Sequence, residues 1–82
     1  MTTHLSERRS PFLDELIASL FSHKRQARGW DHQDVSVRTG LPEDIIRRAE
    51  THPALVLTEV LEQLFDFYEV APAIRRAIGR SA

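Results

Sequence analysis

The sequence predicts an all-α fold, a single compact domain of five helices. Three observations lead to this prediction. Apolar residues recur at spacings of three and four, and no segment of useful length shows the alternation of a β-strand. Signals for helix starts and stops divide the chain into five segments. Three Gly and four Pro among 82 residues are too few for a loop-rich or all-β protein.

The composition is that of a globular domain, with 41% hydrophobic and 28% charged residues. A chain of 82 residues suits one domain, and dimerisation would add to the modest stability of so small a core. The absence of Cys excludes a disulfide scaffold and a thiolate metal site. With no apolar run long enough for a membrane and no secretory signal, we expect a cytoplasmic location and no membrane contact.

The first helix is expected to follow a flexible, polar N-terminal arm at residues 1–9, so that the domain covers residues 10–82. Ser10 is placed to cap this helix, and Pro11 suits its first turn, where a missing N–H costs nothing. The helix is expected to end near Gly29. Its apolar face consists of residues at helical spacing: Phe12, Leu13, Leu16, Ile17, Leu20 and Phe21.

Residues 29–50 predict two short helices joined by a tight turn. Asp31 is placed to cap the first of them, and Asp34 lies near its positive end. Gly40 can end that helix in the left-handed conformation, and Pro42 suits the first turn of the next. The second short helix has an apolar stripe of Ile45, Ile46 and Ala49. This order is typical of a helix-turn-helix, whose second helix enters the DNA major groove.

The last two helices are expected to begin at Thr58 and Pro72. Residues 51–70 carry four acids and no Lys or Arg, so the fourth helix is acidic; in a DNA-binding protein it must point away from the phosphates. The apolar positions of the fourth helix are Val60, Leu61, Leu64, Phe65, Phe67 and Tyr68. In the short fifth helix, Ile74 and Ile78 lie four residues apart.

The connection at residues 51–57, THPALVL, is unusually apolar for a surface loop. One interpretation is that the fourth helix begins early, at Pro53, and that the apolar side chains pack inside. The other is that Leu55, Val56 and Leu57 form a patch for a partner protein or for a second copy of the chain.

Residues 13–78 resemble the phage-repressor (Xre/Cro-like) helix-turn-helix family. Nine positions of the family pattern are matched without a gap: Gly29, Trp30, Asp31, Val35, Ser36, Gly40, Leu41, Ile46 and Glu50. The following helix matches at Leu61, Phe65, Tyr68 and Val70. The resemblance implies a compact, lambda-repressor-like domain that binds double-stranded DNA, and it makes Trp30 an anchor of the core.

The same resemblance puts the recognition helix at about residues 42–49, with base contacts from Glu43, Asp44, Arg47 and Arg48. Arginine suits this role because its planar fork can bond both O6 and N7 of guanine. The two acids depart from the family pattern. A carboxylate can accept from the cytosine amino group, but phosphates repel it. The acids could instead stabilise the positive helix end and pair with Arg47 and Arg48 at i,i+4 spacing.

Further residues take their expected roles from their place in the family pattern. His32 stands where a relative commonly has a Gln that bonds a phosphate, although an exposed His could also make no contact. Arg38 and Thr39, beside the turn, are additional candidates for phosphate contact. Arg25 and Glu50 occupy positions that form a structural ion pair in several relatives, and DNA contact is the alternative.

We therefore expect a small, sequence-specific transcriptional regulator, a repressor, that acts as a homodimer on two half-sites about 34 Å apart. The alternative is that the same fold serves protein–protein contact, as in an antitoxin or adaptor, through the acidic helix and the apolar connection. No enzymatic activity, metal or cofactor is expected. The four His residues are scattered, and no motif surrounds a nucleophile.

Overall fold

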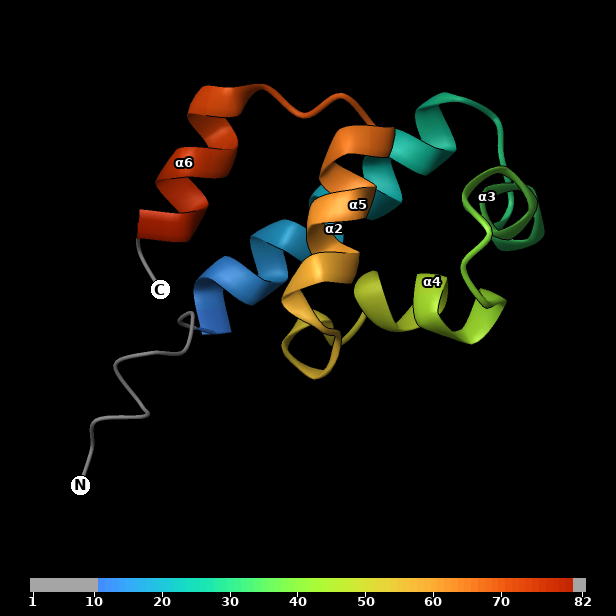
Figure 1. The fold of residues 1–82 in the computed structure, drawn as a ribbon, viewed down its shortest axis with the longest axis horizontal. Coiled ribbons are helices and arrows are strands. Elements are labelled where there is room, and N and C mark those ends of the chain that lie inside the picture. Colours follow the sequence, from blue (N-terminus) through green and yellow to red (C-terminus); the bar gives the residue numbers. More distant parts are fainter. Residues whose placement is uncertain (1–10, 81–82) are drawn as a thin grey trace.

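The computed structural model describes residues 11–80, and side chains to residue 76. The described residues form helices joined by short turns and contain no strand, so the expected all-α, five-helix fold is confirmed (Figure 1). The elements are α2 (Pro11–Ala27), α3 (His32–Thr39), α4 (Glu43–Ala49), the 3-10 helix η1 (Pro53–Leu55), α5 (Thr58–Phe67) and α6 (Pro72–Arg80). The expected arm at residues 1–9 and the expected cap Ser10 lie outside the described residues.

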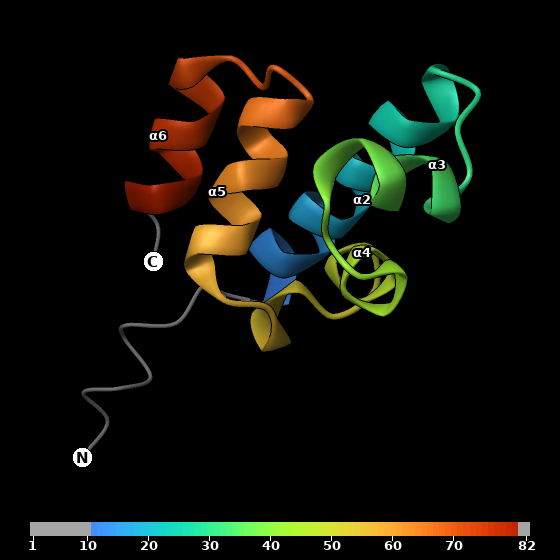
Figure 2. The same cartoon turned by 45° about the vertical axis from the view of Figure 1, so that its right-hand side comes forward.

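The core lies between α2 and α5, with α3 and α4 at one end of the molecule and α6 beside α5 at the other (Figures 1 and 2). Phe21 of α2 meets Phe65 of α5 with ring centroids 5.2 Å apart. Burial of such apolar surface provides most of the folding free energy. The remaining buried members are Ile17, Val35, Ile46, Ala49, Val56, Leu61, Leu64, Tyr68 and Val70.

The start of α3 is fixed by two reciprocal hydrogen bonds between Asp31 and Asp34. The backbone N–H of Asp34 donates to Oδ1 of Asp31 at 2.8 Å, and the backbone N–H of Asp31 donates to Oδ2 of Asp34 at 3.0 Å. This capping box satisfies two N–H groups that a helix start leaves free. The expected cap at Asp31 is therefore present, and Asp34 does more than balance the helix dipole.

The turn between α3 and α4 depends on Gly40, which has φ 81° and donates its N–H to the Ser36 carbonyl at 2.8 Å. That left-handed conformation costs glycine nothing. Pro42 is the cap of α4 and not its first helical residue, because its ψ of 147° is extended. The recognition helix expected from residue 42 thus begins one residue later, at Glu43.

The apolar connection is neither an early start of α5 nor a uniform patch. Pro53 and the two residues after it form the short helix η1. Leu55 and Leu57 are exposed, at 70% and 69%, whereas Val56 between them is 8% exposed and belongs to the core. Val56 was therefore wrongly expected in a partner patch: the backbone is extended at this residue, which turns its side chain inward.

The end of α5 brings a strained residue next to a buried polar one. Glu69 has φ 56°, and its N–H donates to the Asp66 carbonyl at 3.0 Å. A left-handed residue of this kind commonly ends a helix, but glycine is the residue that tolerates it best. Tyr68, directly before it, is 1% exposed, and its hydroxyl has no hydrogen-bond partner among the described residues.

Candidate nucleic-acid interface

Helix α4 packs against α3 and presents its outer side at the edge of the molecule (Figure 1). Ile46 and Ala49 are buried in the core. Asp44, Arg47 and Arg48, on the other side of the same helix, are exposed. Because the apolar and charged residues of α4 separate by helical spacing, the helix is held by one face while the other stays open to solvent.

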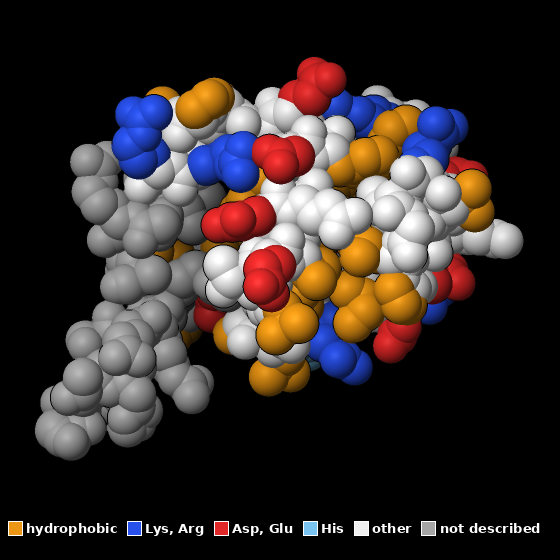
Figure 3. Space-filling model, viewed as in Figure 1, with side chains coloured by type: hydrophobic (Ala, Val, Ile, Leu, Met, Phe, Trp, Pro, Cys, Tyr) orange, Lys and Arg blue, Asp and Glu red, His pale blue; other side chains and the backbone are white. Residues whose placement is uncertain are grey.

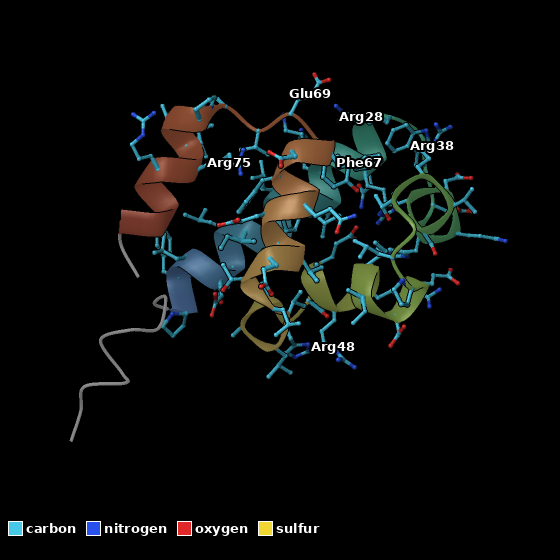
Figure 4. The ribbon with its side chains drawn as sticks, in the orientation of Figure 1. Arg28, Arg38, Arg48, Phe67, Glu69 and Arg75 are labelled. Carbon is cyan, nitrogen blue, oxygen red and sulfur yellow. The ribbon has the colours of Figure 1, made fainter. Side chains whose placement is uncertain are left out.

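The charged residues of α4 differ in their partners. Nη2 of Arg47 donates to Oε2 of Glu43 at 3.1 Å, the i,i+4 pair that the sequence left open. Exposed pairs of this kind contribute well under 1 kcal/mol, about 0.3–0.5 kcal/mol on a helix, so Arg47 remains available to a ligand. Asp44 and Arg48 form no ion pair with a described residue. Figure 4 shows Arg48 at the lower edge of the molecule.

Arg25 and Glu50, expected to pair, form a bidentate ion pair that joins α2 to the end of α4. Nε and Nη2 of Arg25 donate to the two carboxylate oxygens of Glu50 at 2.8 and 3.0 Å. Nη1 of Arg25 donates to the Trp30 carbonyl at 2.9 Å. The hydrogen bond to Glu50 raises the pKa of Arg25, and burial opposes it only in part. The pair is therefore structural: it fixes the end of α4 against α2.

His32 contributes to the same junction. Its Nε2 lies 3.1 Å from Oε1 of Glu50, and the residue is half-buried. One ring nitrogen thus faces a carboxylate inside the protein and not the solvent. The phosphate contact expected of His32 would have to come from its other ring nitrogen, so its first role is structural.

Thr39 and Ser36 hold the turn together from inside. The Thr39 hydroxyl donates to the Val35 carbonyl at 2.8 Å and accepts the N–H of Leu41 at 3.1 Å. The Ser36 hydroxyl donates to the Leu41 carbonyl at 2.5 Å. The hydroxyl expected to meet a phosphate is therefore occupied by its own backbone, as is common for Ser and Thr beside turns.

Arg38, the remaining expected phosphate contact, lies over the indole of Trp30, with 4.3 Å from its Cζ to the ring centroid. Arg28 approaches the same ring at 5.7 Å and the Tyr68 ring at 5.5 Å. Trp30 itself is half-buried and packs against Phe67, so only part of it anchors the core. Arg28 was not expected at this site, because no local pattern of the sequence links it to Arg38, ten residues later.

The acidic side chains of the second half gather over α5 on the face seen in Figure 3. Asp66, one of them, pairs with Arg75 of α6 at 2.6 Å. Arginines lie at the margins of this face, among them Arg28 and Arg38 near one corner (Figure 4). The local distribution of charge matters more for nucleic-acid binding than the net charge of −1.

Residues 11–80 were also compared with what a metal site and a membrane span require. No three His, Asp or Glu side chains of this range come together in a way that could hold a metal ion. None of its helices has the length and hydropathy needed to cross a bilayer. Searches for similar proteins among protein-family models, curated proteins and solved structures found no match.

Proposed function

We propose that this protein is a small, sequence-specific DNA-binding regulator, a repressor of the phage-repressor type that acts without catalysis. One observation carries the proposal. The two short helices α3 and α4 pack around a glycine turn, and α4 offers Asp44, Arg47 and Arg48 to solvent at the edge of the molecule. A helix held in this way has the geometry needed to enter a major groove.

Within this proposal, Arg48 is the principal contact of α4 with a base or phosphate, because no carboxylate of a described residue neutralises it. Arg47 joins it once its weak pair with Glu43 opens. Asp44 accepts from a cytosine amino group and disfavours other bases at that position. Arg25, His32 and Glu50 act indirectly, by fixing the orientation of α4.

The proposed active form is a homodimer, since one α4 reads only half of a palindromic operator. Leu55 and Leu57 are large apolar side chains that stay exposed in the connection after α4. They are the proposed contact between subunits. Their small area predicts a weak dimer that DNA stabilises, because a standard interface buries about 800 Å² on each partner.

The test is selection of bound fragments from random duplex DNA, followed by affinity measurements on the selected site. Arg48→Ala should weaken binding by about 1–3 kcal/mol, or roughly 5- to 150-fold, without unfolding the protein. Arg76→Ala, an exposed arginine on α6, is the matched control and should have a much smaller effect. Equal losses in both variants, or no enriched sequence, would contradict the proposal.

A second candidate function is supported by the exposed Leu55 and Leu57, which directly precede the acidic helix α5 in the chain. In this alternative the fold serves as a protein-interaction module, such as an antitoxin or adaptor. The discriminating property is salt dependence. A DNA-binding protein loses affinity for mixed duplex DNA with a slope of about −0.9 per phosphate contact, whereas the interaction module has no measurable affinity even at low salt.

A further inference from the structure

Two arginines and one tryptophan form a stack at the junction of α2 and α3, which we call the Trp30 stack. It consists of Arg28, Trp30 and Arg38. Arg38 lies 4.3 Å and Arg28 5.7 Å from the same indole centroid, measured from Cζ. The attraction between a guanidinium and an aromatic face holds both side chains over the ring although both are exposed to solvent.

The hydrogen-bond donors of the stack are largely unused within the described residues. Arg28 donates once, from Nη1 to the Lys24 carbonyl at 3.2 Å, and Arg38 forms no side-chain hydrogen bond. Neither forms an ion pair with a described carboxylate, unlike Arg25, Arg47 and Arg75. Asp31 and Asp34, which lie in the chain between these two arginines, each accept the other's backbone N–H in the capping box and form no ion pair with Arg28 or Arg38.

The geometry of the stack favours phosphates as ligands. A guanidinium stacked on a ring keeps its N–H donors in its own plane, directed outward, in the fork that matches phosphate oxygens. Because both distances share one centroid, the two Cζ atoms lie no farther apart than the sum of 4.3 and 5.7 Å. This upper limit is compatible with contacts to one phosphate or to two neighbouring phosphates of a DNA strand.

We infer that the Trp30 stack binds the phosphodiester backbone of duplex DNA as a contact separate from α4. Figure 4 places Arg28 and Arg38 together at one corner of the molecule and Arg48 at the opposite edge. The stack therefore holds phosphates outside those that border the α4 contact. It adds affinity that depends on salt and not on base sequence. This inference rests on the proposed function, which supplies duplex DNA as the source of phosphate.

Trp30 is the only tryptophan of the chain, so its fluorescence reports on this site alone. The experiment titrates mixed-sequence duplex DNA into the protein and follows Trp30 emission at several salt concentrations. In the unmodified chain, DNA should change the emission. Arg38→Ala and Arg28→Ala should each lower the salt slope by about 0.9, one phosphate contact, and leave the sequence preference unchanged. Circular dichroism checks the fold, and Arg76→Ala is again the control.

The outcomes separate this inference from the proposed function. If Arg48→Ala weakens operator binding while Arg38→Ala leaves the salt slope and emission response intact, the inference is overturned and the proposed function stands. If no operator is selected but mixed duplex still changes the emission through Arg28 and Arg38, the proposed function fails and the inference stands. A response only to an acidic peptide or to a second copy of the chain would overturn the inference.

Discussion

Replacing Tyr68 by Phe should stabilise this protein, against the usual effect of a core substitution. The Tyr68 hydroxyl is buried without a hydrogen-bond partner among the described residues, a situation that costs about 1–3 kcal/mol. Tyr68→Phe removes that cost and keeps the ring contacts with Phe21 and Phe67, whose centroids lie 5.9 and 4.9 Å away. The void left by one hydroxyl costs only a few tenths of a kcal/mol, at about 24 cal/mol per Å³.

The expected gain is therefore about 1–2 kcal/mol in the free energy of unfolding at neutral pH. For a domain of this size, each kcal/mol moves the melting temperature by about 4–8 °C. Thermal unfolding followed by circular dichroism measures the shift. A melting temperature lower than that of the unmodified chain would refute the reasoning, because it would mean that the hydroxyl has a stabilising partner in solution.

The same substitution should change the response to alkaline pH. Burial, reinforced by the charge of Glu50, raises the pKa of Tyr68 to about 12. The native state thus favours the neutral phenol. The stability that comes from this difference in pKa is fully present below the unfolded pKa of about 10. It is lost as the pH rises through about 12, and the loss is at most about 2–3 kcal/mol. Tyr68 is the only tyrosine, so tyrosinate absorbance follows this titration directly. The Tyr68→Phe variant should lose less stability over this window.

Three other substitutions test the scaffold by urea or thermal unfolding. Arg25→Ala should lower the free energy of unfolding by about 2–3 kcal/mol, because it leaves the Glu50 carboxylate, at 6% side-chain exposure, without its arginine. The loss is somewhat below that typical of a buried pair, since Glu50 retains its contact with His32. Unchanged stability would show that the pair is not structural. Glu69→Gly should gain about 1 kcal/mol by relieving its left-handed backbone, and a loss would disprove that strain. Gly40→Ala should cost about 1–2 kcal/mol from conformation alone, because an added Cβ meets no atom within 4 Å; a neutral result would contradict this.

The helix boundaries could be predicted from the sequence because their causes are local. The cap at Asp31, the left-handed turn at Gly40 and the start of α6 at Pro72 each depend on the chemistry of one residue and its immediate neighbours. At Pro42 the predicted start was one residue early, because φ suits a helix but ψ is extended. The proline ring fixes φ, so the sequence predicts that angle, but ψ depends on the residues around it. The larger error was the possible helix start at Pro53, where the chain forms the separate helix η1.

The candidate site was less predictable because its contacts join residues far apart in the chain. That His32 faces Glu50 follows from the crossing of α3 and α4, which no local pattern contains. The direction of Val56 depends on one extended residue after a 3-10 turn. Arg28 reaches Trp30 only because the chain bends at Gly29, with φ 73°. Spacing could identify the charged residues but not their partners.

The Glu50 carboxylate binds Arg25 of α2 and contacts His32 of α3, and the same residue caps the end of α4, so one side chain joins three helices. None of the outward residues of α4 takes part in this junction. The residues that hold α4 in place, Ile46, Ala49 and the cap Glu50, are thus different from the residues that the helix exposes to solvent. Under the proposed function, the exposed positions of α4 can therefore be exchanged to change the bound DNA sequence while the junction at Glu50 is preserved.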